Sequence, residues 1–156
     1  MLNPETFKII VNHTPLVSID ICILYEDKML MCKRKNNPLK DEWFTPGGRI
    51  YKNETIDAAL QRICNIELGL SGFNLKDFIL LGAWDHMFGN SIFGKSISTH
   101  YINLPHLMKL SYKPEIKLDT QHDSFKWTTL EEISQDQTYH AYMQNYARLI
   151  LDQIRC

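Results

Sequence analysis

The sequence predicts a single domain of the α+β class (mixed α/β) over residues 1–156, in which a mixed β-sheet is sandwiched between α-helices. Three observations support this fold class. The 156 residues, 44% of them hydrophobic and 22% charged, suffice for one domain with a substantial core. Apolar or alternating runs of strand length follow one another through loops and hairpins, with few helices between them. Two amphipathic patterns, one central and one C-terminal, supply helices that can cover the sheet.

The expected helices have recognisable ends. Asn3 is a suitable N-cap and Pro4 fits the first helical position, so a short helix begins there. It ends near His13, because Pro15 discourages its continuation. Three further helices are expected: one over 54–68 closed by Gly69, one capped near Thr128 or Thr129, and one over 140–154.

The expected strands are apolar or alternating runs bounded by polar loops. The first two are separated by a short polar segment and read as a hairpin. The third is short and meets a Pro-Gly-Gly turn. The strands are expected at 15–25, 28–35, 43–44, 77–88, 98–107 and 125–130.

The glycine pair after Pro46 is the first feature that indicates a site. Two glycines let the backbone approach a ligand closely and leave its carbonyl and amide groups available. The positive end of the following helix points back toward this turn. Because Pro-Gly-Gly also occurs in ordinary turns, these residues alone do not identify a ligand site.

Composition and charge argue against several classes of protein. The formal net charge is −1 without a block of like charges, so neither a nucleic-acid footprint nor a membrane-surface patch is indicated. No run of about 18 apolar residues and no signal peptide is indicated, so we expect a cytoplasmic protein. Four cysteines without paired spacing fit reduced thiols better than disulfides or a zinc site: Cys22, Cys32, Cys64 and Cys156.

The spacing beyond the glycines matches the Nudix box, whose usual pattern is Gx5Ex7REUxEExGU, where U is aliphatic. Six fixed positions agree within 23 residues: Gly48, Glu54, Arg62, Glu67, Gly69 and Leu70. The segment therefore resembles a Nudix box, and the resemblance implies a Nudix fold and a Nudix hydrolase domain over the whole chain.

The departures from this box concern its carboxylates. Ile63 and Ile66 stand where the usual box has glutamates, and Cys64 takes the first aliphatic position. Three glutamates within about one helical turn could converge on a cluster of Mg²⁺ ions, which prefer oxygen ligands. Because only Glu67 remains, this helix should hold fewer metal ions, most simply one.

One branch of the Nudix superfamily has the same thinned box, and this sequence is similar to it along nearly its whole length. That branch is the GDP-mannose mannosyl hydrolases. The segments that carry the similarity are 14–20, 33–34, 43–49, 54–62, 67–70, 99–101 and 121–123. The resemblance implies hydrolysis of GDP-mannose, or GDP-glucose, to GDP and free sugar. In this reaction water attacks the anomeric carbon and the configuration inverts.

The resemblance also implies an active site. One Mg²⁺ per subunit, with Mn²⁺ as an alternative, would be bound by the carbonyl of Gly47, the carboxylate of Glu67 and the amide oxygen of Gln121. His122 would be the general base, and its ordinary pKa near 6.5 suits that role. For a loop histidine, solvent exposure without function is the simpler alternative.

The same matching assigns eight residues to the substrate. They are Arg34, Arg49, Arg62 and Tyr101 at the phosphates, Asp20 and His86 at the sugar, and Leu2 and Phe7 at the guanine. Arginine donors suit phosphates, but Arg62 could instead brace the helix. Asp20 and His86 could equally be structural strand residues, and Phe7 could be a core anchor of its helix.

Two other functions stay open at this level. One is a Nudix pyrophosphatase that cuts a nucleotide sugar into a nucleoside monophosphate and a sugar phosphate. The other is a non-catalytic Nudix-fold sensor of nucleotide sugars. The resemblance further implies a homodimer, and the mannose specificity is less firmly implied than the type of reaction.

Overall fold

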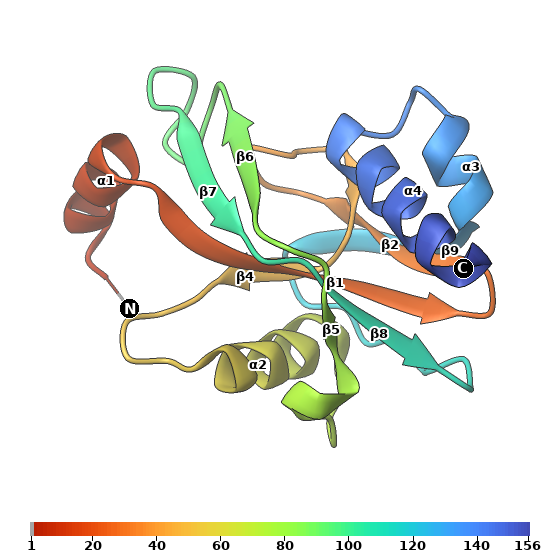
Figure 1. Cartoon of the computed structure of the whole chain (residues 1–156). Coiled ribbons are helices and arrows are strands. Elements are labelled where there is room, and N and C mark those ends of the chain that lie inside the picture. Colours follow the sequence, from red (N-terminus) through yellow and green to blue (C-terminus); the bar gives the residue numbers. More distant parts are fainter. Residues whose placement is uncertain (1) are drawn as a thin grey trace.

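The computed structural model describes residues 2–156 as a mixed sheet with helices on both faces (Figure 1). Helix α2 (Ile56–Leu68) covers one face, and α3 (Leu130–Gln135) and α4 (Ala141–Arg155) cover the other. Helix α1 (Pro4–His13) lies to one side, next to the start of the first strand. The predicted α+β class, with a sheet between helices, is confirmed.

Within residues 2–156 the sheet has nine strands. Their bounds are β1 Leu16–Tyr25, β2 Lys28–Arg34, β3 Trp43–Phe44, β4 Gly47–Arg49, β5 Ile79–Leu80, β6 Trp84–Phe88, β7 Thr99–Asn103, β8 His106–Leu110 and β9 His122–Thr129. A short 3₁₀-helix, η1 (Leu75–Asp77), precedes β5.

Strand β1 is shared by the two halves of the sheet. Its first residues pair in parallel with β7, where Leu16 lies opposite Tyr101. From Ile21 onward it pairs in parallel with β8 instead, beginning opposite His106. Its other edge pairs with β4 and then with β2. Asp20 therefore lies where β1 changes partners and where the two halves of the sheet diverge.

The core consists of two hydrophobic clusters, one on each face of the sheet. In β1 the alternation of side chains sends Ile19, Ile21 and Ile23 toward α2, and Cys22 and Leu24 toward α3 and α4. Such a strand, buried on both faces, explains the nearly continuous apolar run in the sequence.

Most of the predicted helices are confirmed at or near their predicted ends. Helix α1 begins at Pro4, and the side chain of Asn3 accepts hydrogen bonds from two amides of its first turn. Helix α3 is capped by Thr129, and α4 follows a cap at His140. Over residues 2–156, no helix combines the length and the apolar character needed to cross a membrane.

Two strands predicted as continuous are each broken in two. The run 77–88 forms η1, β5 and β6, and it bends at Gly82, whose φ of 104° is rarely open to other residues. The run 98–107 forms β7 and the start of β8, interrupted at Pro105, which has no amide hydrogen to give to a sheet. Apolar character hides both interruptions in the sequence.

The predicted glycine turn is wrong, because Gly47 and Gly48 lie in β4 and pair with β1. A Cβ atom at Gly47 would lie 2.5 Å from both Asp20 Oδ1 and the Ile19 carbonyl oxygen. The glycine is thus required by close contact between strands. Three boundaries also shift by two or three residues. Helix α2 begins at Ile56, two residues later than predicted. Strand β9 begins at His122, three residues earlier, and β8 ends at Leu110, three residues later.

Candidate active site

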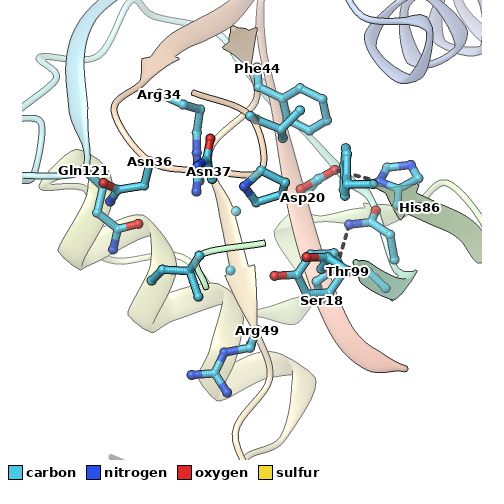
Figure 2. A pocket seen from close by; sticks show the side chains of 18 of the residues that line it. Ser18, Asp20, Arg34, Asn36, Asn37, Phe44, Arg49, His86, Thr99 and Gln121 are labelled. Carbon is cyan, nitrogen blue, oxygen red and sulfur yellow. Dashed lines mark hydrogen bonds and ion pairs between the residues drawn. The ribbon is translucent and has the colours of Figure 1, made fainter. Parts of the chain in front are cut away.

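A cavity of about 260 Å³ opens beside β1, β4 and α2. Figure 2 shows Arg34, Asn36, Asn37 and Gln121 on one side of it and Ser18, Asp20, His86 and Thr99 on the other. Ten of the twelve predicted site residues line it: Phe7, Asp20, Arg34, Gly47, Arg49, Arg62, Glu67, His86, Tyr101 and Gln121. The other two, Leu2 and His122, are not among the lining residues.

We call Arg34, Glu67 and Gln121 the charged end of the cavity. Glu67 is its buried carboxylate, with 6% of the residue exposed. Its Oε2 atom accepts a hydrogen bond of 3.1 Å from the Gly47 amide. Burial raises the pKa of Glu67 to about 8, although this hydrogen bond and the charge of Arg34 oppose the rise. Among residues 2–156 no salt bridge compensates the carboxylate.

The charged end fits a divalent cation. The carboxylate of Glu67, the backbone of Gly47 and the amide of Gln121 border the same cavity and supply oxygen donors, which suit Mg²⁺. A buried carboxylate with a raised pKa gains most from a cation beside it. No group of three His, Cys, Asp or Glu side chains that could hold a metal occurs in residues 2–156, and the other oxygen donors beside Glu67 are those of Gly47 and Gln121.

The two isoleucines that replace box glutamates lie in different surroundings. Ile63 is 1% exposed, belongs to the hydrophobic cluster beneath α2, and lies next to Gly48. Ile66 is 57% exposed and is not among the residues that line the cavity. Only the first of these positions has therefore become part of the core.

Arg34 is an unpaired cation at the cavity wall. Its Nε atom is buried without a hydrogen-bond partner, and the side chain forms no salt bridge with any other residue of 2–156. Its charge nevertheless lowers the pKa values of Asp20, Glu67 and Tyr101, in opposition to burial. A partly buried guanidinium whose Nε has no partner is suited to bind an anionic group such as a phosphate.

Arg62 is engaged within the protein. Its Nε atom donates a 2.6 Å hydrogen bond to Glu54, and its terminal nitrogen donates to Glu54 and to the backbone oxygen of Arg49. The guanidinium also lies 4.0 Å from the centroid of the Tyr51 ring. Hydrogen bonding to Arg62 lowers the pKa of Glu54. These contacts support the structural alternative, in which Arg62 braces the box.

Arg49 connects β4 to α1 through an aromatic ring. Its guanidinium lies 4.1 Å from the centroid of the Phe7 ring and 5.5 Å from that of Tyr51. The Phe7 ring in turn meets Phe93 edge to face at 5.5 Å. Arg49 and Phe7 both line the cavity, whereas Leu2 is 46% exposed.

We call Ser18, Asp20, His86 and Asn103 the network end of the cavity. They line its wall, and Tyr146 of α4 lies behind them. The Tyr146 hydroxyl lies 2.7 Å from Asp20 Oδ2, 2.8 Å from Asn103 Oδ1 and 3.3 Å from His86 Nε2. Asn103 Nδ2 donates a 2.8 Å hydrogen bond to Ser18 Oγ.

Burial also controls ionisation at the network end. It raises the pKa of Asp20 to about 6, even though hydrogen bonds from Tyr146 and Asn103 lower it. It lowers the pKa of His86 to about 4, so this imidazole is neutral at pH 7. His86 Nδ1 lies 3.9 Å from Asp20 Oδ2. With Asp20 ionised at pH 7, the wall presents one carboxylate among neutral groups.

His122 is buried beside the cavity, and its side chain is fully shielded from solvent. Its Nδ1 atom lies 2.8 Å from Asp119 Oδ1, while Nε2 is buried without a partner. Burial lowers the pKa of His122, and the contact with Asp119 opposes this shift. If Nδ1 donates its hydrogen to Asp119, Nε2 keeps a free lone pair. The neighbouring Gln121, by contrast, does line the cavity.

Several lining residues were missed by the sequence prediction. Asn36 and Asn37 come from a polar loop that was assigned no role. Ser18 and Asn103 were part of runs predicted only as strands, yet they are polar and buried. A buried polar residue inside an apolar strand was the one available signal for these two. Tyr146 lies in the run 140–154, which was predicted only as an amphipathic helix, and nothing in that pattern marked its hydroxyl.

Comparisons with known proteins agree with the fold. Residues 14–150 match the NUDIX domain family. The chain is also similar to the low-salt glycan biosynthesis protein Agl8 of Haloferax volcanii. Their identity is 34% over 122 residues, which are 78% of this chain and 76% of that protein.

Solved structures show the same architecture. The MutT NUDIX hydrolase from Burkholderia pseudomallei has a TM-score of 0.72 and 21% identity, over 88% of this chain and 99% of that one. The NUDIX domain of NrtR from Shewanella oneidensis, solved with ADP-ribose, has a TM-score of 0.68 and 14% identity, over 98% and 94%. At these identities the likeness concerns the fold.

Proposed function

The chain belongs to the Nudix family of hydrolases, and we propose that it hydrolyses a GDP-sugar, GDP-mannose or GDP-glucose, to GDP and the free sugar. The observation that carries the proposal is the single buried carboxylate, Glu67, at the charged end of a cavity whose other end is lined by neutral groups and Asp20. A diphosphate suits the first end and the hydroxyls of a sugar suit the second.

Nudix hydrolases generally use divalent metals such as Mg²⁺. Here one Mg²⁺ per subunit, or Mn²⁺ in its place, would be held by Glu67, the Gly47 carbonyl and Gln121, and when bound it stabilises negative charge on the departing diphosphate. A reaction in which GDP is the leaving group needs no second metal to generate hydroxide.

Other side chains around the cavity bind the phosphates and the sugar in this proposal. Arg34 and Arg49, with Tyr101, donate hydrogen bonds to the phosphates. Asp20 and His86 bind hydroxyls of the sugar. Water attacks the anomeric carbon, the bond from this carbon to the phosphate oxygen breaks, and the configuration inverts. The electron pair of that bond leaves with GDP, on the phosphate oxygen.

His122 is the proposed acceptor of the proton that the attacking water loses. Its Nδ1 contact with Asp119 orients the ring and leaves Nε2 as the basic atom. Because Nε2 is buried in this structure, the atoms that cover it must move before water can reach it. The lowered pKa keeps the imidazole neutral and able to accept a proton at pH 7.

One relative also supports a sugar nucleotide as the substrate. The Agl8 relative is named for glycan biosynthesis, a process that consumes activated sugars. The proposed metal ligands are supported separately, because Arg62 and Glu54 brace α2 against β4 and keep Glu67 next to Gly47. The homodimer implied by the resemblance stays a prediction.

One assay tests the proposal against its alternatives. The protein is incubated with Mg²⁺ and GDP-mannose or GDP-glucose in ¹⁸O-labelled water, and the nucleotide and sugar products are identified by mass. We expect GDP, with the label on the sugar carbon. GMP and a sugar phosphate, with the label on phosphorus, would instead identify a pyrophosphatase. Tight binding without any product would identify a sensor. The variant Glu67→Gln serves as the inactive control.

A further inference from the structure

We infer that Tyr146 of α4 is a positioning residue, whose buried hydroxyl holds Asp20 and His86 in the mutual arrangement that recognises the sugar. The inference rests on the proposed function, because it assigns the network end of the cavity to the sugar. Tyr146 does not line the cavity, so it acts through the residues in front of it.

The hydroxyl of Tyr146 joins three segments that are distant in the sequence. Asp20 comes from β1, His86 from β6 and Asn103 from β7, and each has a polar atom within 3.3 Å of this oxygen. Tyr146 itself is 0% exposed, and its ring meets Trp84 edge to face at 5.6 Å. A fully buried phenol cannot exchange its partners for water, so it fixes their relative positions.

The Tyr146 hydroxyl is needed to connect Asp20 with Asn103 by hydrogen bonds. It carries one hydrogen but lies beside two oxygens, Asp20 Oδ2 and Asn103 Oδ1. In one consistent arrangement a protonated Asp20 donates to Tyr146, which donates to Asn103. In the other, the Asn103 amide is turned over and donates to Tyr146, which donates to ionised Asp20. In both arrangements the Tyr146 oxygen is the atom that links Asp20 to Asn103.

A second tyrosine on the same face of α4 supports the His86 ring. Tyr142, one turn before Tyr146, stacks on His86 with 3.9 Å between ring centroids and 4° between the planes. Its hydroxyl accepts a 2.9 Å hydrogen bond from the Met87 amide. His86 is therefore fixed on its face by one tyrosine and at its edge by the other.

This support is expected to determine which sugar is bound. GDP-mannose and GDP-glucose differ in the orientation of one hydroxyl, and a site separates two such ligands only if its donors and acceptors are held in place. Without the Tyr146 hydroxyl, Asp20 loses its 2.7 Å partner and can turn toward either epimer. The charged end has no contact with Tyr146 and should bind GDP as before.

The test uses Tyr146→Phe in the full chain, with Tyr139→Phe as a matched control. Tyr139 is also buried in the core cluster beneath α4, but its hydroxyl takes no part in the network. For each protein, kcat/KM is measured with GDP-mannose and GDP-glucose, together with the inhibition constant of GDP. Thermal melting establishes that each variant is folded.

For Tyr146→Phe we expect kcat/KM for the preferred sugar nucleotide to fall by roughly tenfold to a hundredfold. The preference between the two sugars should shrink, and inhibition by GDP should stay within about twofold of the wild type. Tyr139→Phe should change none of these values. An unchanged sugar preference, or an equal loss of GDP binding, would overturn the inference.

Two further experiments test the role of Tyr146 when the first comparison cannot be made. If the wild type hydrolyses neither substrate, the proposed function fails, and calorimetry then compares the binding of GDP-mannose with that of GDP. Selective weakening of GDP-mannose by Tyr146→Phe supports the positioning role, whereas equal weakening refutes it. If Tyr146→Phe does not fold, Tyr142→Leu is used instead. Tyr142 is partly exposed, and its replacement removes the ring that stacks on His86. The binding of GDP-mannose and of GDP is then compared in the same way.

Discussion

At the charged end of the cavity, Arg34 has no carboxylate partner and Glu67 has a single backbone hydrogen bond. At the network end, Asp20 and His86 are both held by Tyr146, which is itself buried. One wall is thus left with an unpaired guanidinium and a carboxyl group whose pKa is raised to about 8, and the other has its hydrogen bonds already made.

This difference between the walls suits a charged ligand at the charged end and the neutral hydroxyls of a sugar at the network end. Uncompensated charges destabilise an empty site, but they give strong interactions to a charged ligand such as a cation with a diphosphate. Hydroxyls are neutral and bind through geometry, so they require a wall whose groups do not move.

Replacement of the proposed base, His122→Gln, should reduce turnover by roughly two to four orders of magnitude and leave GDP binding largely intact. Glutamine keeps a polar side chain of similar length but cannot accept a proton at pH 7. Steady-state rates and equilibrium binding of GDP measure the two effects separately. A loss of less than about tenfold would show that another group takes the proton, and Asp20 would be the first to examine.

The metal-free protein should lose stability as the pH rises from about 4.5 to about 8. Burial raises the pKa of Glu67 above its ordinary value of 4.5, so the folded state retains a proton that the unfolded chain releases. The stability due to this proton is complete below pH 4.5 and is lost by pH 8. The change should be on the order of a few kcal/mol.

Urea unfolding in a chelating buffer across this pH range measures that loss. Asp20, whose pKa is raised to about 6, contributes in the same direction at lower pH. Added Mg²⁺ should restore stability most at high pH, where Glu67 is ionised. Glu67→Gln should flatten the pH dependence between pH 6 and 8, and an unchanged slope in this variant would contradict the assignment.

Gly47 contacts both ends of the cavity, because its amide donates to Glu67 and it lies opposite Asp20 in the sheet. Gly47→Ala should destabilise the fold by about 1–3 kcal/mol. A methyl group there would meet Asp20 Oδ1 and the Ile19 carbonyl oxygen at 2.5 Å, so the strands must separate. Gly48→Ala is the matched control, because its nearest neighbours are side-chain atoms of Ile63 at 3.6 Å. Thermal melting of the pair measures the difference, and equal melting temperatures would refute the steric argument.

Replacement of Arg34 should weaken GDP binding, whereas replacement of Arg62 should lower stability. Arg34→Gln removes an unpaired cation, so GDP should bind roughly tenfold to a hundredfold more weakly without loss of stability. Arg62→Gln breaks the bonds to Glu54 and the Arg49 carbonyl, so it should lower stability by about 1 kcal/mol and change GDP affinity little. Calorimetry and melting of both variants test this. Weaker GDP binding in Arg62→Gln alone would reverse the assignment.

The part of the cavity beside α2 could be anticipated from the sequence because it is local. Gly47 directly precedes the Nudix box, Arg62 and Glu67 belong to it, and the three lie within 21 residues. The structure brings all three to one cavity. His122 was named from a short matching segment, and neither its burial nor its contact with Asp119 could be read from that segment.

The network end could not be anticipated in the same way. Asp20 and Tyr146 are 126 residues apart and meet only because α4 packs on the face of β1 opposite to α2. Asp20 was named from the resemblance, but its partner was not. Pattern alone likewise missed the breaks at Gly82 and Pro105, because sheet pairing decides which part of an apolar run is extended.

The contrast between Ile63 and Ile66 determines what a carboxylate would cost at each position of this helix. A glutamate at position 66 would be exposed and cost little. A glutamate at 63 would be buried in the hydrophobic cluster, one helical turn from Glu67, whose pKa is already raised to about 8. A carboxylate at position 63 would therefore need a cation beside it to offset its burial, whereas one at position 66 would not.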